Sequence, residues 1–347
     1  MANPTQKQLS AQFFRFAVFA ALFAYGVILL GAYTRLSDAG LGCPDWPGCY
    51  GRLFAPTTAQ DLAEARQFHP DKAADSGKAW KEMVHRYVAG ALGLVILRLA
   101  ALAWRQRRQN RRQQFVIPLV VTGLVIFQAA LGMLTVTLQL KPLIVMAHLL
   151  GGMTILALLW WIMLREQRFW KSKPDSPATR SLRPWAAVGL VIVALQIALG
   201  GWTSANYAAL VCPDFPTCQG VWWPSMDFID GFTLWRGLGI NYEGGVLSLS
   251  AATAVPMAQR LGALITALYL GWLGWRTIRV GDENKLCRFG MLVLAVLLAQ
   301  ITLGIMNVLL HLPVAIAVAH NAVAALLLLA LVTLNHVIRP PAARSTA

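Results

Sequence analysis

Three histidines of this chain lie in apolar stretches of sequence, where an ionisable side chain is costly. His85 follows Glu82 in EMVHRYVAGAL, His148 lies in VMAHLLGGM, and His320 lies in VAHNAVAAL. When such a stretch crosses a membrane, an ionisable residue within it is a candidate for function. The alternative for each of them is a structural histidine, hydrogen-bonded and packed between helices.

The positions of these histidines along their stretches indicate a common depth. Each follows the expected outer end of its helix by a few residues. At a rise of about 1.5 Å per residue, this places it roughly 5 to 12 Å below the outer boundary. Two imidazoles at one level, on facing helices of a four-helix bundle, are suited to be the axial ligands of a haem iron. Zinc is the alternative, but two imidazoles without a third ligand make a poor zinc site.

Charged residues near the same level could serve such a haem. Glu82 lies one turn before His85 on the same helix face. A carboxylate there could move protons or stabilise a developing cation; the alternative is a favourable position near a helix N-terminus. Arginines near the outer boundary are candidates for pairing with haem carboxylates or, alternatively, for snorkelling to lipid headgroups: Arg35, Arg86 and Arg260.

The elements that position these residues are expected to be membrane helices. Of the 347 residues, 57% are hydrophobic and 13% charged, and the mean hydropathy of +0.56 is too high for a soluble globular protein. A helix needs about 20 mostly apolar residues to cross a bilayer. The apolar stretches predict an all-α integral membrane protein with eight transmembrane helices, at residues 13–34, 83–104, 115–138, 143–164, 185–206, 256–275, 289–310 and 314–336.

The chain also contains an internal repeat. GAYTRLSDAGLGCPDWPGCYG, from Gly31, aligns with GGWTSANYAALVCPDFPTCQG, from Gly200, and QAALGMLTV aligns with QITLGIMNV. We therefore expect two tandem four-helix bundles, residues 1–170 and 171–347. Because each half has an even number of helices, the two bundles should have the same orientation in the membrane.

The second half has a different set of residues at the aligned positions. His320 aligns with His148, whereas Gln259 stands where the first half has His85, and Glu82 has no acidic counterpart. A neutral amide oxygen binds haem iron much more weakly than an imidazole. A haem in the second half would therefore be five-coordinate through His320, bound to water, or absent. The carboxylate chemistry is expected in the first half alone.

Basic loops predict the orientation of the chain. RQRRQNRR at 105–112, the loop at 165–183 and the loop at 276–288 are rich in arginine and lysine. The positive-inside rule places these loops and both termini in the cytoplasm. Loops of this kind also account for the formal net charge of +15, so we expect no nucleic-acid partner.

Two cysteine pairs of identical spacing lie in loops on the opposite, outer side. They are Cys43 and Cys49 in CPDWPGC, and Cys212 and Cys218 in CPDFPTC. Because the outer side of a bacterial inner membrane is oxidising, we expect two short-loop disulfides. Zinc ligation is the alternative, but the spacing fits it poorly. The predicted location is the bacterial inner membrane, with several passes and with the two cysteine loops outside.

Taken together, GAYTRLSDAGLGCPDWPGCYG, EMVHR, VMAHLLGG, CPDFPTC and VAHNAVAAL resemble the haem A synthase family, membrane enzymes that oxidise haem O to haem A for cytochrome oxidases. The resemblance covers nearly the whole chain. It implies oxidation of a ring methyl group of haem O, through hydroxylation, to a formyl group. It also implies a substrate site at His85 and His148, a need for Glu82, a role for the first cysteine loop, and a haem b cofactor in the second half, where only His320 matches.

Gln259 departs from the family pattern. A natural variant, an engineered substitution and a homologue without activity would each explain it. The implied partners are haem O, membrane lipid, an electron acceptor and the haem O synthase that would supply the substrate; a homo-oligomer stays open. The alternative function is that of a dihaem b-type electron-transfer protein without substrate conversion. A transporter with repeated halves would leave the glutamate and the paired histidines without a role.

Overall fold

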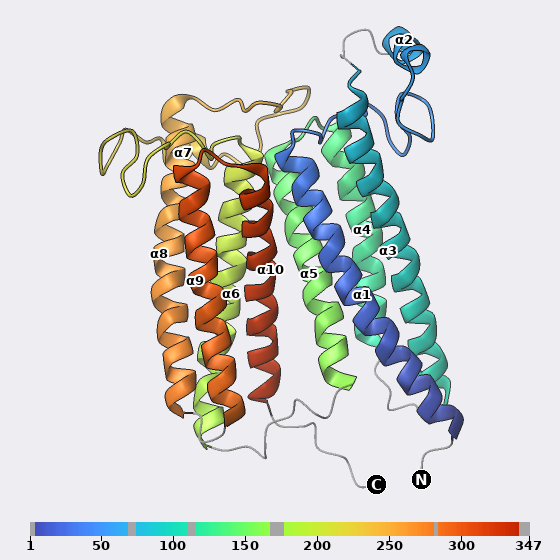
Figure 1. Cartoon of the computed structure of the whole chain (residues 1–347), viewed down its shortest axis with the longest axis vertical. Helices are drawn as coiled ribbons and strands as arrows, with labels where there is room; N and C mark the ends of the chain where they lie inside the picture. Colours follow the sequence, from blue (N-terminus) through green and yellow to red (C-terminus); the bar gives the residue numbers. More distant parts are fainter. Residues whose placement is uncertain (1–3, 69–73, 110–114, 167–176, 281–283, 340–347) are drawn as a thin grey trace.

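The structure is a computed structural model that describes residues 4–68, 74–109, 115–166, 177–280 and 284–339, and its regular elements in these ranges are helices (Figure 1). In chain order they are α1 (Pro4–Leu36), α2 (Ala59–Phe68), α3 (Ser76–Gln109), α4 (Val116–Thr137), α5 (Pro142–Glu166), α6 (Pro177–Ala205), α7 (Phe228–Gly231), α8 (Leu249–Val280), α9 (Asn284–Leu309) and α10 (Val314–Val337). Long helices cover each apolar stretch of the sequence. The short α2 and α7, which the sequence analysis missed, lie in the loops that carry the cysteines.

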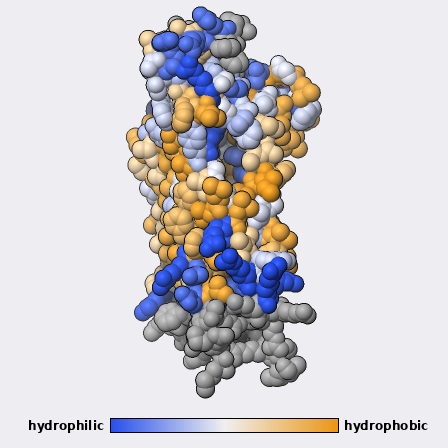
Figure 2. Space-filling view, turned by 90° about the vertical axis from the view of Figure 1, so that its right-hand side faces the viewer, coloured by the Kyte–Doolittle hydropathy of each residue, from blue (hydrophilic) through white to orange (hydrophobic). Residues whose placement is uncertain are grey.

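The described residues form seven helices that are long and apolar enough to cross a membrane: α1, α3, α4, α5, α6, α9 and α10. The 32-residue α8 is as long, but Gln259 and Arg260 interrupt its apolar stretch. Figure 2 shows one side of the molecule, with a largely apolar band between two hydrophilic ends. The chain is therefore a multi-pass membrane protein. Parts of the predicted cytoplasmic loops, residues 110–114, 167–176 and 281–283, lie outside the described residues.

The long helices pack in two groups of four (Figure 1). In the first group α1 and α4 each pack against both α3 and α5, so α3 and α5 occupy opposite corners of a ring. In the second group α6 and α9 each pack against both α8 and α10. The groups meet where α5 packs against α6 and α10, and where α1 packs against α10. Helices that follow one another closely in the chain thus build each ring.

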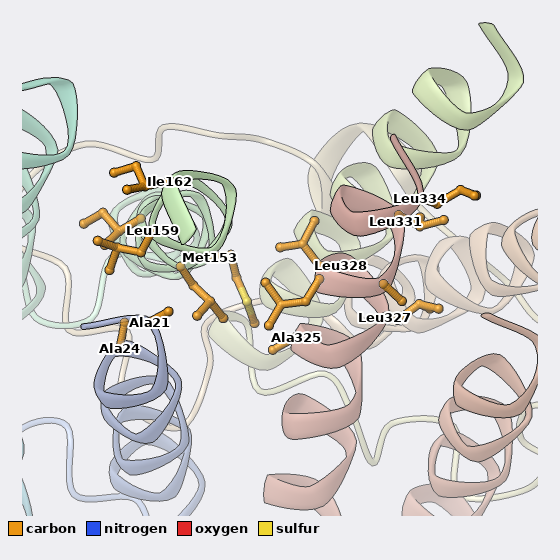
Figure 3. Packing of buried hydrophobic residues seen from close by; sticks show 14 of the residues in the cluster. Ala21, Ala24, Met153, Leu159, Ile162, Ala325, Leu327, Leu328, Leu331 and Leu334 are labelled. Carbon is orange, nitrogen blue, oxygen red and sulfur yellow. The ribbon is translucent and has the colours of Figure 1, made fainter. Parts of the chain in front are cut away.

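The main apolar core lies toward the end of the structure where α1 begins and α10 ends. Figure 3 shows Met153 of α5 in this core, facing Ala325 and Leu328 of α10. Lipid tails are as apolar as these side chains, so close packing, rather than removal from water, holds membrane helices together. The alanines that let α1 approach its neighbours closely are all buried: Ala17, Ala20, Ala21 and Ala24.

The small face of α1 yields a prediction about stability. Ala20 has no exposed surface, whereas Leu22, two residues along the same helix, is 61% exposed. Ala20→Leu should force α1 away from its neighbours and destabilise the fold by about 1–3 kcal/mol. Leu22→Ala, the matched control, should change stability little. Thermal unfolding of the purified protein in detergent measures both, and equal melting temperatures for the two variants would contradict the proposed packing.

Candidate functional site

A loosely packed layer separates the apolar core from the two cysteine loops. The core cluster lies on one side of this layer, and two smaller clusters, around Cys43 and around Trp202, lie on the other. Residues 143–152 of α5 and 318–324 of α10 are half-exposed throughout, although each of these helices packs against four others. Interiors normally pack as densely as organic crystals. The side chains of α5 and α10 are therefore less fully covered at this level, which is the level of His148 and His320, although Leu149 of α5 still lies close to Gly201 of α6.

The two histidines of the first half lie on the opposite corners of its ring, His85 on α3 and His148 on α5. Each ring is next to a glycine of a neighbouring helix. A Cβ on Gly31 of α1 would lie 2.9 Å from Cε1 of His85, and a Cβ on Gly132 of α4 would lie 3.5 Å from Cε1 of His148. The Nδ1 atoms of both imidazoles are buried without a hydrogen-bond partner. Since a buried polar atom normally has one, both rings are suited to receive a ligand.

The second half repeats this arrangement with one change of residue. A Cβ on Gly304 of α9 would lie 3.1 Å from Cε1 of His320 on α10. A Cβ on Gly200 of α6 would lie 3.3 Å from the Nε2 atom of Gln259 on α8. Gln259 thus occupies the place that His85 occupies in the first half, with the aligned glycine beside it. The second half can offer one imidazole and one amide to a ligand between its helices.

A glutamine one turn before the glycine accompanies three of these four positions. Gln128 of α4 donates to the main-chain oxygen of His148 over 2.7 Å, and Gln196 of α6 donates to that of Gln259 over 3.1 Å. Gln300 of α9 instead lies 3.1 Å from Nε2 of the His320 ring. Sequence reasoning did not single out these glutamines. The recurring pattern Gln-x-x-x-Gly was the signal that could have identified them.

Glu82 lies beneath the first cysteine loop and is only 5% exposed. One carboxylate oxygen accepts the main-chain N–H of Cys43 over 2.8 Å, and the other pairs with Arg86 one turn along α3. Because α3 begins at Ser76 and has no acidic residue in its first turn, the helix N-terminus does not account for this carboxylate. An ionised carboxylate at such a buried place is compensated by the guanidinium and by the N–H group.

Arg86 and Arg260 hold the two cysteine loops in the same way. Arg86 donates to the main-chain oxygens of Asp45, Pro47 and Gly48 at 2.6–3.3 Å. Arg260 donates to three main-chain oxygens of the second loop at 2.6–3.0 Å: those of Asp214 and Thr217, which align with Asp45 and Gly48, and that of Cys212. Pairing of these arginines with haem carboxylates stays a prediction, and their guanidinium groups already satisfy loop carbonyls. Arg260 has no acidic partner on its helix comparable to Glu82.

Both loops are closed by the expected disulfides, Cys43–Cys49 and Cys212–Cys218, whose four cysteines are buried. Inside the second loop Asp214 accepts the Thr217 hydroxyl and the N–H groups of Gln219 and Gly220. The Thr217 hydrogen bond, followed by these backbone ones, holds the pKa of the Asp214 carboxyl below its usual range. Asp45 accepts backbone N–H groups in the first loop in the same manner.

Two basic residues of the first half connect it to the second. Arg35, at the end of α1, donates to the main-chain oxygen of Ser204 over 2.5 Å and lies 4.0 Å from the centre of the Tyr207 ring. Lys141, 1% exposed, donates to a main-chain oxygen of the second outer loop and lies 3.1 Å from the centre of the Trp235 ring. Cation–π contacts of this kind strengthen when water is excluded. Arg35 therefore joins the halves, and its pairing with a haem carboxylate stays a prediction. Lys141 is a second connection, which sequence reasoning missed.

The described residues contain no group of three or more histidine, cysteine, aspartate or glutamate side chains that could hold a metal ion by themselves. A haem brings four nitrogen ligands of its own and needs from the protein only one or two axial ligands. The first half, with two imidazoles on opposite helices, fits a haem with two axial ligands. The second half, with His320 and Gln259, fits a haem bound by one imidazole.

Comparison with known proteins connects this arrangement to a family. Residues 14–332 match the family described as "Cytochrome oxidase assembly protein". A protein named "Heme A synthase" from Shewanella oneidensis is 44% identical over 315 residues, which cover 91% of this chain and 93% of that protein. Proteins of the same name from Rhizorhabdus wittichii and Caulobacter vibrioides are 26% and 28% identical, over 92% and 90% of this chain and 92% and 91% of theirs.

The glycine beside His85 yields a prediction about the site. Gly31→Ala would place a methyl group 2.9 Å from the ring, whereas Gly26→Ala on the same helix meets nothing within 4 Å. Both changes improve helix propensity by up to about 1 kcal/mol. A difference in haem content between the two variants therefore reports the contact with the His85 ring. Gly31→Ala should displace the imidazole and reduce the haem retained by the purified protein, measured from its absorption spectrum. Equal haem content in the two variants would show that the contact is unimportant.

Proposed function

Because the chain belongs to the cytochrome oxidase assembly protein family, we propose that it is a haem A synthase, which oxidises a ring methyl group of haem O, through hydroxylation, to the formyl group of haem A. The observation that carries the proposal is the pair of imidazoles, His85 and His148, on opposite helices of the loosely packed layer. The relatives named "Heme A synthase" align with nearly the whole chain.

The first half is proposed as the substrate site. His85 and His148 would bind the iron of haem O from opposite sides, each ring steadied by the glycine beside it. His85 on α3 and His148 on α5 would together hold the haem between these helices and so orient it relative to Glu82. The substrate would enter from the lipid at the level where residues 143–152 of α5 are half-exposed.

Glu82 is proposed as the proton acceptor of the reaction. With water as the source of the oxygen atom, converting a methyl group to a formyl group consumes one water molecule and releases four protons and four electrons. The protons need a base near the methyl group, and the electrons leave one at a time to an external electron acceptor. Glu82 is one turn from His85 on α3, and it is the carboxylate buried beneath the first loop. A proton taken up by Glu82 would weaken its pairing with Arg86 and Cys43. The first cysteine loop would thereby respond to the progress of the reaction.

The second half is proposed as the site of a haem b cofactor. His320 would hold it from α10, with Gln259 on the opposite side, where the first half has His85. When bound, such a haem supplies one-electron transfer, which the stepwise removal of electrons from haem O requires. The residues of the protein would provide the single imidazole of His320 and the neighbouring glycine, Gly304.

The first prediction from this function concerns the bound haems. The purified chain, produced together with a supply of haem O, should contain haem O or haem A in addition to haem b. Glu82→Gln should retain haem O and lose at least 90% of the haem A, since an amide cannot accept the proton. Chromatography of the extracted haems provides the measurement. If the unaltered chain contains haem b alone, the dihaem b-type electron-transfer alternative is correct instead.

We also propose an arrangement in the membrane. The chain would cross the bacterial inner membrane eight times, with α8 as the eighth helix, as two tandem four-helix halves, residues 1–170 and 171–347, of the same orientation. The closed ring of helices in each group supports this division. Both termini would be cytoplasmic, and both cysteine loops would lie outside, as the basic loops indicate.

Labelling of single cysteines in intact cells tests the orientation. In a Cys287→Ser background, which removes the one cysteine of the described chain that forms no disulfide, Gln60→Cys in α2 should react with a membrane-impermeant thiol reagent. Arg107→Cys, at the other end of α3, should react only after the membrane is permeabilised. Both positions are exposed in the structure. The reverse pattern would overturn the proposed orientation.

A further inference from the structure

The aligned glutamines of α4 and α9 make different hydrogen bonds. Gln128 donates its side-chain N–H to the main-chain oxygen of His148 over 2.7 Å. Gln300 places the same atom 3.1 Å from Nε2 of the His320 imidazole. The two glutamines occupy equivalent places in their halves, each one turn before the glycine that lies beside the histidine ring. A difference in the facing helices must therefore cause the difference in contact.

The residue three positions after each histidine explains it. In α5 this residue is Gly151, and a Cβ there would collide with the Gln128 amide, whose Cδ lies 2.8 Å from that point. Gln128 reaches the main chain of α5 only because Gly151 has no side chain. In α10 the aligned residue is Val323. Because a Cβ at Gly151 would collide with the Gln128 amide, the Cβ that Val323 carries at the aligned position should exclude the amide of Gln300 from the equivalent place, and that amide lies beside the imidazole ring instead.

This contact engages the atom that a haem iron would use. An amide N–H can donate to Nε2 only when that nitrogen carries a lone pair, so the ring proton lies on Nδ1. The Nδ1 atom of His320 is buried without a partner. The side chain of Gln128, by contrast, donates to the main-chain oxygen of His148, so it does not engage the His148 ring in this way. A glutamine side chain therefore contacts the ring of His320 and not that of His148, although the aligned glycine and glutamine are present beside both.

We propose that Gln300 and Val323 are positioning residues that control how readily His320 binds a ligand. Gln300 occupies the Nε2 lone pair of His320, and Val323 keeps Gln300 there. A haem entering the second half must first displace this amide, whereas in the first half the aligned amide of Gln128 is held by the main chain of His148. The second site is thereby weaker than the first, beyond the effect of Gln259. This inference rests on the proposed function of His320 as a haem b ligand.

Haem titration of the full chain tests the inference. The protein, prepared without haem and carrying His85→Ala and His148→Ala so that only the second half can bind, is placed in lipid nanodiscs and titrated with haem b. Gln300→Leu removes the amide, and Val323→Gly opens the space into which Gln300 can withdraw. Each should tighten binding by about threefold to tenfold, the equivalent of one hydrogen bond. The controls Gln128→Leu and Val314→Gly should leave the dissociation constant unchanged.

A second measurement needs no haem. In histidine-labelled protein, the nitrogen-15 resonance of the His320 Nε2 atom, identified by its loss in His320→Ala, should shift in Gln300→Leu and in Val323→Gly. It should stay in place in Val314→Gly. Since the two test variants act on different helices, failure of one to fold leaves the other as a test.

The outcomes separate this inference from the proposed function. Tighter binding together with the shifted resonance in either test variant supports the inference. Haem binding at His320 that neither variant tightens, with an unshifted resonance, overturns the inference and leaves the haem b site standing. Absence of haem binding in the parent and in both variants overturns the inference and the proposed haem b site together.

Discussion

The structure depends on one constraint, which is the cost of placing an imidazole inside an apolar helix bundle. Such a ring needs space between helices that otherwise hold together by close packing. The chain meets this need with a glycine of the neighbouring helix beside each ring, Gly31 beside His85 and Gly132 beside His148. Tight packing of small and branched residues is kept for the other end of the bundle, around Met153 and Leu328. The tightly packed core and the level of the histidines thus lie at different heights along the helices.

The outer loops close the bundle above this layer. A disulfide closes each loop covalently. Arg86, one residue after His85, and Arg260, one residue after Gln259, donate hydrogen bonds to the main-chain oxygens of these loops. The ligand-bearing helix and the loop are therefore one mechanical unit in each half. In the first half alone, a buried carboxylate is added to the unit through Glu82. Chemistry that changes the protonation of Glu82 would be transmitted to the loop.

The repeat does not make the halves equivalent, because a few substitutions change which atoms are free. His85 is replaced by an amide, Glu82 has no acidic counterpart, and Val323 takes the place of Gly151. Each change leaves the helices in place and alters the contacts of single side chains. The duplication gives two similar groups of four helices. Single residues then give the two groups different side chains at the aligned positions. Contacts such as those of Arg35 and Lys141 then hold the two halves together at the outer face.

The sequence by itself determined the apolar helices, the internal repeat, both disulfides and the three histidines worth attention. These features are encoded in local composition and in fixed spacings, which need no knowledge of distant contacts. Only the tertiary structure decided that Glu82 lies beneath a loop, that Arg86 and Arg260 bind loop carbonyls, and that Gln300 reaches an imidazole. Each of those contacts joins residues far apart in the chain, and a pattern along the sequence does not specify which of several polar partners a side chain will meet when helices pack.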